Sequence, residues 1–238
     1  MFGLTRFWRS TIGKKVVMAV TGIIGILFVL GHMTGNLLMF KGQGAMHEYA
    51  LLLRTSMPLL YAVRAVLLLS VILHIVAAYQ LTMLSRAARP DGYAERKPQV
   101  TTFAARTIKF GGVVILFFLV YHILDLTLGV VHPDFTHLDP YNNVRIGLAN
   151  PLVAGLYLLA SAFVGLHLYH GAWSAVRTLG AARASTQPLK RKIALGLAIV
   201  VAVGFLIIPV ATLMGAFAPA PPLSETPAVT QAATGETH

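Results

Sequence analysis

The residues best suited to chemistry in this chain are histidines inside long apolar segments. His32, His74, His122 and His167 lie in four different segments, and His170 follows one helical turn after His167. Ionisable side chains in a membrane interior are rare and usually functional. A histidine in each of four consecutive segments is therefore poorly explained by four unrelated hydrogen bonds between helices, and it indicates a set of metal ligands.

The depth of the histidines divides them into two pairs. On the side expected to face outward, His32 lies eight residues from Phe40 and His122 lies ten residues from His132. His74 and His167 both lie 16 residues deep. At about 1.5 Å per helical residue, the two pairs differ in depth by roughly 10 Å, so they cannot converge on one copper or zinc ion.

Two histidine pairs on facing helices suit two six-coordinate haems. A planar macrocycle accepts one imidazole on each face, and the protein sets its potential through ligands and surroundings. A bis-histidine haem leaves no coordination position open for oxygen and therefore transfers electrons. Electron transfer needs a donor and an acceptor, and the sequence has no flavin or iron–sulfur motif. The residues thus predict two b-type haems, a quinone in the membrane and a further subunit on the cytoplasmic side.

The composition places these segments in a membrane. The 238 residues are 56% hydrophobic and 11% charged, whereas about 25% of a typical soluble chain is charged. Nineteen Lys and Arg residues outnumber eight Asp and Glu residues, and in so apolar a chain we assign the excess to cytoplasmic loops, not to nucleic-acid binding. Because there is no cysteine, the chain supplies no disulfide, thiolate zinc site, cysteine-ligated iron–sulfur cluster or thioether-attached haem.

Five apolar segments are long enough to cross a bilayer, which takes about 20 helical residues. They are Val16–Phe40, Pro58–Leu84, Phe110–Val131, Pro151–Val176 and Ile193–Phe217. We therefore predict an all-α polytopic membrane protein with one domain, residues 16–217, in which five transmembrane helices include four bundled around two haems. Small residues beside the ligands leave room for a flat ring, although they also serve plain helix packing. These are Gly22, Gly25, Gly31, Gly35, Gly111, Gly112, Gly165 and Gly171.

Basic residues gather on one side of the predicted membrane domain. Fifteen of the 19 precede the first segment or lie between segments two and three or four and five. By the positive-inside rule, residues 1–15 are expected in the cytoplasm of a bacterium, and the C-terminus outside its cytoplasmic membrane. On the outer side we expect a short interfacial helix within Gly44–Met57 and an ordered cap over His132–Asn150. Residues 218–238, rich in Pro, Ala and Thr, are predicted to form a disordered tail.

Four short segments, within a likeness that covers about Trp8 to Phe217, resemble one protein family. They are Ser10–Lys15 (STIGKK), Tyr141–Asn143 (YNN), Asn150–Val153 (NPLV) and Gly165–Ser174 (GLHLYHGAWS), and the stretch from His167 is the most specific. Together they resemble the five-helix, di-haem cytochrome b subunit of succinate:quinone oxidoreductases, the membrane subunit of succinate dehydrogenases and fumarate reductases.

The resemblance implies that this chain anchors a flavoprotein and an iron–sulfur subunit to the cytoplasmic face. Succinate is then oxidised in the flavoprotein, and electrons pass through the clusters to quinone, of which menaquinone is the expected type. The chain is thereby a subunit of a respiratory and tricarboxylic acid cycle enzyme, with no catalytic residue for succinate of its own. The direction of turnover and a higher oligomer of the complex both remain open.

The resemblance also implies ligand roles. His74 and His167 are expected to hold the inner haem, near the cytoplasm, and His32 and His122 the outer haem. Depth alone leaves His170 open as a ligand, whereas the family motif favours His167. Fumarate-reducing members of the family can carry a carboxylate, proposed to move protons, two residues before this ligand. That position is Gly165 here, so the proton route is not expected.

Haem propionates and quinone carbonyls need cations or hydrogen-bond donors near the membrane edges. Snorkelling at helix ends is the alternative role for each basic side chain. The inner candidates are Lys14, Tyr79, Arg86, Arg106, His170, Trp173, Ser174 and Arg177, and the outer ones are His47, Glu48, Arg54, Tyr61 and Arg64. Asp125, the one carboxylate within a predicted span, either relays protons or pairs with a basic side chain.

Three other functions stay open at this level. A di-haem cytochrome b could serve a different respiratory complex, and the motif around His167 argues against it. A proton or solute carrier could use the histidines as a relay, but carriers more often show broken helices or matched halves, and the sequence has neither. A haem-free anchor would keep the histidines for packing, and haem content separates it from the others.

Overall fold

The computed structural model describes residues 2–88, 103–181, 183–221 and 223. The regular structure in these ranges is helical, with five long helices: α2 (Thr11–Asn36), α4 (Met57–Ala87), α5 (Phe103–Leu126), α7 (Pro151–Thr178) and α8 (Gln187–Leu213). The shorter elements are α1 (Phe2–Arg9), α3 (Gln43–Leu52), α6 (Pro140–Ala149) and the 3₁₀ helices η1 (Leu37–Lys41) and η2 (Ala184–Thr186). Each long helix is long and apolar enough to cross a membrane. The prediction of an all-α chain with five candidate membrane spans is therefore confirmed.

The helix ends differ from the predicted segments because hydropathy does not detect polar helix termini. The first long helix begins at Thr11, not Val16, since the Ser10 side chain caps it by accepting a hydrogen bond from the Gly13 amide at 2.9 Å. The fifth begins at Gln187, with a proline in its first turn. The third ends at Leu126, not Val131. Past that end the chain turns at Gly129, whose φ of 69° suits glycine.

The four histidine-bearing helices are arranged in the order α4, α2, α7, α5, each packed against the next. Helix α8 lies outside this set and packs mainly against α7, with a smaller contact to α2. The first and last helices of the row, α4 and α5, make at most a marginal contact with each other. Helix packing therefore closes three sides of this four-helix bundle. The fourth side, between α4 and α5, is not closed by direct packing of the two helices.

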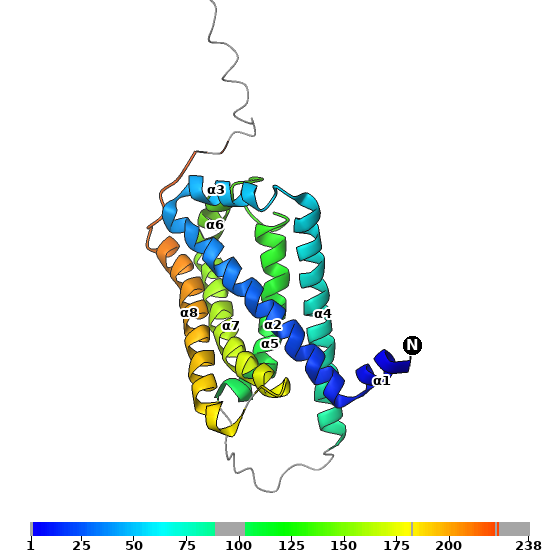
Figure 1. Ribbon diagram of the computed structural model, residues 1–238. Coiled ribbons are helices and arrows are strands. Elements are labelled where there is room, and N and C mark those ends of the chain that lie inside the picture. Colours follow the sequence, from blue (N-terminus) through cyan, green and yellow to red (C-terminus); the bar gives the residue numbers. More distant parts are fainter. Residues whose placement is uncertain (1, 89–102, 182, 222, 224–238) are drawn as a thin grey trace, which may run out of the picture.

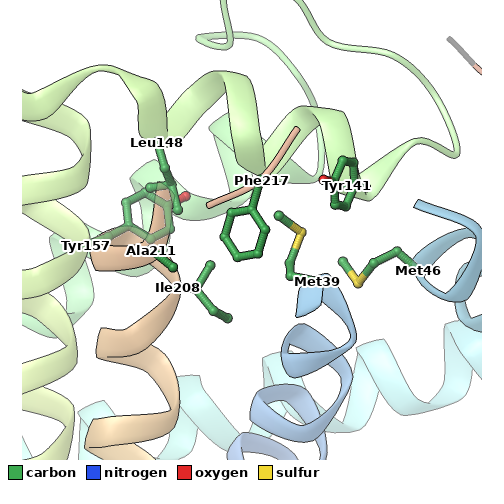
Figure 2. Packing of buried hydrophobic residues seen from close by; sticks show 8 residues of the cluster. All are labelled: Met39, Met46, Tyr141, Leu148, Tyr157, Ile208, Ala211 and Phe217. Carbon is green, nitrogen blue, oxygen red and sulfur yellow. The ribbon is translucent and has the colours of Figure 1, made fainter. Parts of the chain in front are cut away.

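Helices α3 and α6 lie across one end of the bundle (Figure 1), here called the cap end. They correspond to the interfacial helix and the ordered cap expected from the sequence. An apolar cluster joins them to the ends of η1, α7 and α8 (Figure 2). Its members are Met39, Met46, Tyr141, Leu148, Tyr157, Ile208, Ala211 and Phe217. The cap is thus fastened to η1 and to two long helices, α7 and α8, by a core of its own.

The start of the C-terminal tail is ordered against this cap, contrary to the predicted boundary at residue 218. The Ala218 carbonyl accepts a hydrogen bond from the Tyr141 hydroxyl at 3.0 Å, and the Ala220 carbonyl accepts one from Asn142 at 3.0 Å. The Pro221 carbonyl accepts one from Gln43 at 2.8 Å. Polar side chains of the cap therefore donate hydrogen bonds to the backbone carbonyl groups of this segment. Its Pro and Ala residues have no polar side chains that could do so. Residues 222 and 224–238 lie outside the described residues.

The opposite end of the bundle, here called the basic end, carries the starts of α2, α5 and α8 and the ends of α4 and α7 (Figure 1). Within the described ranges, most of the basic residues lie at these termini, in α1 or in the link between α7 and α8. Helix α1 also lies at this end and projects away from the bundle (Figure 1). The asymmetry of charge that the sequence shows along the chain is thus an asymmetry between the two ends of the molecule.

Candidate cofactor sites between the long helices

The four intramembrane histidines form two pairs inside the bundle. The rings of His32 on α2 and His122 on α5 have centroids 5.7 Å apart. The rings of His74 on α4 and His167 on α7 have centroids 6.1 Å apart. In the order α4, α2, α7, α5, each pair joins two helices that are not neighbours, so both pairs cross the middle of the bundle.

The two pairs lie at different levels because the helices alternate in direction. Helices α2 and α5 run toward the cap end, and His32 and His122 are near their C-terminal ends. Helices α4 and α7 start at the cap end, and His74 and His167 lie in their later halves. The level predicted from residue counting therefore matches the arrangement of helices, with the first pair nearer the cap.

The spacing within each pair suits a metal ion held between two imidazoles. With about 2 Å from the metal to each ring nitrogen, the two ring centroids lie about 6 Å apart. Within the described ranges, no group of three or more His, Asp or Glu side chains could hold a metal ion. A two-ligand site needs other donors to complete the metal's coordination, and a porphyrin supplies four in one plane.

The hydrogen bonds of His74 and His122 within the described residues engage Nδ1 and leave Nε2 of each ring without a partner. The Nδ1 atom of His74 lies 3.1 Å from the Met18 carbonyl oxygen and 3.2 Å from Thr21 Oγ1. A carbonyl can only accept, so Nδ1 carries the proton and Nε2 keeps its lone pair. The Nδ1 atom of His122 lies 3.2 Å from the Tyr157 hydroxyl. Ligating histidines are typically oriented by such a bond from their second nitrogen.

The other two histidines, His167 and His32, are less well oriented by hydrogen bonds. The His167 Nδ1 atom is buried without a hydrogen-bond partner among the described residues, which ordinarily costs about 1–3 kcal/mol. The His32 Nε2 atom lies 3.3 Å from Asn36 Nδ2. That amide has to release the nitrogen before His32 can bind a metal through Nε2. The donor set fits a bis-histidine haem at each level, with this adjustment at His32.

Glycines near the histidines divide into two groups. A Cβ on Gly22 would lie 3.4 Å from His74 Cε1, and one on Gly112 would lie 3.9 Å from His167 Cε1. Gly25 and Gly31 have no heavy atom within 4 Å of a built Cβ. The backbone beside the histidines is therefore small and partly open. Gly35, Gly111 and Gly165 instead sit against Tyr49, Phe163 and Ala202, so these three serve packing.

The protein covers little of the two helices that do not pack together. Only Ser70 and Ala77 of α4 are buried, and only Ala104, Gly111 and Asp125 of α5. Both helices nevertheless contribute a ligand candidate that points to the middle of the bundle. Few residues of α4 and α5 are therefore covered by other parts of the described chain.

Asp125 pairs with a tyrosine, not with the basic side chain that was one of its two expected roles, and the other role, a proton relay, stays a prediction. Asp125 is 2% exposed, and its carboxylate accepts a hydrogen bond from the Tyr157 hydroxyl at 2.9 Å. It does not pair with a basic side chain within the described residues.

Tyr157 and Thr21 are functional candidates that the sequence analysis missed. Neither carries a local signal, because each meets its histidine only across a helix interface.

At the basic end, aromatic and cationic side chains from α7 and α8 stack together. The guanidinium carbons of Arg177 and Arg191 lie 4.6 and 4.7 Å from the centre of the Trp173 ring. Ser174 and Arg177 line a pocket of about 430 Å³ together with Lys15 and the start of α2. Two of the inner candidates, Ser174 and Arg177, thus line one opening between α2 and α7. Trp173 stacks on Arg177 and on Arg191, which the sequence did not mark.

Other inner candidates lie elsewhere. Lys14 is buried and donates to the carbonyl oxygens of Trp8 and Arg9 at 2.7 and 3.2 Å, so it fastens α1 to α2. Tyr79, Arg86 and Arg106 are exposed on α4 and α5.

His170 is half-buried, and its ring centroid lies 6.3 Å from that of Trp173. His170 therefore contacts Trp173, and the described residues show no ring contact between it and His74.

The outer candidates divide between the cap and α4. His47 Nδ1 contacts the Leu138 carbonyl oxygen at 3.0 Å, which fixes it within the cap, and Glu48 is exposed on the same helix.

Arg54 donates to the Ala50 carbonyl at 2.8 Å. Partial burial, and secondarily the charge of Arg64, lowers the pKa of Arg54 below its usual value. Arg64 is exposed, 5.9 Å from the ring of Tyr61.

In comparisons with known proteins, no family model, no curated protein and no solved structure matches this chain.

Proposed function

We propose that the chain is a membrane cytochrome b that carries electrons across the bundle through two bis-histidine haems. The observation that carries the proposal is the pair of diagonal histidine contacts, with ring centroids 5.7 and 6.1 Å apart at two levels. Haem supplies a one-electron couple in the membrane interior. The chain's own residues hold and orient it: His32 and His122 nearer the cap, His74 and His167 nearer the basic end.

We further propose that the chain is the membrane anchor of a succinate:quinone oxidoreductase. The resemblance of His167–Ser174 and the three shorter motifs supports this finer assignment. In it, the basic end faces the cytoplasm and meets the iron–sulfur subunit, while the cap faces outward, as the positive-inside rule favours. Quinone, expected to be menaquinone, takes or gives the electrons at one membrane edge. Ser174, Trp173 and Arg177 are the donors best placed at the basic end.

The first experiment is a reduced-minus-oxidised spectrum with haem quantified per chain, on the detergent-purified complex. We expect two b-type haems per chain. A flavoprotein and an iron–sulfur subunit should be recovered with the chain when it is purified from native membranes. Haem without these subunits would favour a di-haem cytochrome of another respiratory complex. Absence of haem would refute the electron-transfer proposal and leave the bare anchor or the histidine relay.

The His170→Ala variant should retain both haem spectra. The His170 ring of the wild type lies beside that of Trp173. The ring that contacts His74, with centroids 6.1 Å apart, is that of His167. Spectra of the purified variant check this directly, with the stoichiometry of two haems unchanged. Loss of one haem would mean that His170, not His167, is the ligand on α7.

A further inference from the structure

We infer that Tyr157 and Asp125 position and polarise His122, and thereby lower the reduction potential of the haem that His122 holds. The inference rests on the proposed function, since it requires His122 to be a haem ligand. It assigns positioning roles to two residues and leaves the ligand set unchanged.

The three side chains form a directed chain of hydrogen bonds. The Tyr157 hydroxyl donates to Asp125 Oδ2 at 2.9 Å, and the Tyr157 hydroxyl oxygen itself lies 3.2 Å from His122 Nδ1. A tyrosine hydroxyl has one proton. Because that proton points to the carboxylate, Tyr157 can only accept from His122, whose Nδ1 must carry a proton. The chain therefore selects the tautomer that leaves Nε2 free for a metal.

The fold holds this chain of bonds rigidly. Asp125 follows His122 by three residues on α5, which puts both on one helix face. Tyr157 reaches them from α7 and is 9% exposed, and Asp125 is 2% exposed. The Phe118 ring packs edge-on against Tyr157 with centroids 4.9 Å apart. An acidic side chain buried in a membrane span is costly, and here its hydrogen-bond partner connects it to a ligand candidate.

No equivalent chain reaches the other three histidines within the described residues. His74 Nδ1 has neutral partners, the Met18 carbonyl and the Thr21 hydroxyl. His167 Nδ1 has none, and His32 contacts the Asn36 amide. The acidic group therefore acts on one ligand of one pair, which makes the inference selective and testable.

The sign of the effect follows from charge. A carboxylate linked to a ligating histidine raises the basicity of the ring, which favours the more positively charged, oxidised metal. Removing the link should therefore raise the reduction potential of the outer haem. Outer-shell partners of metal ligands commonly change affinity or activity by about 10- to 100-fold.

The test is a redox titration of both haems in the purified complex, followed by their absorbance. In Tyr157→Phe, we expect the ratio of reduced to oxidised outer haem at a fixed potential to rise by about tenfold, equal to about 59 mV for one electron. The inner haem should not change. Asp125→Asn keeps an acceptor for Tyr157 but removes the charge on which the sign depends, so it should shift the outer haem in the same direction.

The matched control is Tyr121→Phe. Tyr121 lies on α5 with its ring 6.4 Å from that of Tyr157, so it tests the loss of a nearby phenol outside the chain of bonds. The His122→Ala variant identifies the spectrum of the outer haem. Equal shifts in Tyr121→Phe and Tyr157→Phe, or equal shifts of both haems, would contradict the inference.

The outcomes separate this inference from the proposed function. Two haems per chain with an unshifted outer potential in Tyr157→Phe and Asp125→Asn would overturn the positioning role alone. A wild-type chain without haem would overturn both. If Tyr157→Phe loses the outer haem, Asp125→Asn decides, because it preserves the shape of the site and the Tyr157 ring.

Discussion

Replacing either His74 or His167 with alanine should remove the same haem and leave the other in place. Each variant is expected to fall from two haems per chain to one, with identical remaining spectra. The physical reason is that the two rings face each other across the bundle with centroids 6.1 Å apart, so neither can bind a six-coordinate iron alone. His32→Ala and His122→Ala should remove the other haem, by the same reasoning at 5.7 Å.

Haem quantification and difference spectra of the four purified variants measure this result. The internal control is the haem that each variant retains, because it reports that the bundle is still folded. Loss of different haems in His74→Ala and His167→Ala would refute the pairing. A variant that loses both haems would show that the two levels are not independent.

Replacing Gly165 with leucine should prevent stable packing of α7 against α8. A Cβ at Gly165 would lie 2.8 Å from Ala202 Cβ and 3.6 Å from the Ala198 carbonyl oxygen. Neither neighbour can rotate away, so the helices must separate. Overpacking of this kind costs typically about 1–3 kcal/mol and sometimes more. We expect a clear loss of folded, monodisperse protein in detergent and a lower thermal midpoint for what remains.

The matched control lies on the same helix. Gly155 is exposed, with no heavy atom within 4 Å of a built Cβ, so Gly155→Leu should leave yield and thermal midpoint close to those of the wild type. Size-exclusion chromatography and thermal unfolding of both variants in one detergent make the comparison. Similar behaviour of the two variants would mean that contact between α7 and α8 is not what makes Gly165 necessary.

The contact at Gly165 also bears on the carboxylate proton route that the sequence analysis does not expect at this position. Because Ala202 and Ala198 of α8 fill the space beside Gly165, a carboxylate side chain has no room at this position without a shift of α8. The glycine is therefore tied to the way in which α8 packs on α7. Any proton movement near the inner histidines has to use other groups.

The sequence by itself determined the membrane class, the number of spans and the levels of the histidines. Hydrophobicity and helix length act along the chain, and the depth of a residue in a straight helix depends only on counting. For the same reason, residue counting placed His32 and His122 near one end of the bundle and His74 and His167 near the other. It misplaced helix ends such as Thr11 and Leu126, where caps and turns decide.

The tertiary structure alone decided which side chains orient the histidines. Tyr157 meets Asp125 and His122 because α7 packs against α5, and Thr21 meets His74 because α2 packs against α4. These contacts depend on the rotation of one helix about its axis relative to another, which apolar composition does not specify when lipid and protein interior are equally apolar. Lys14 shows the same limit, since a basic residue expected at a cofactor instead binds the end of α1.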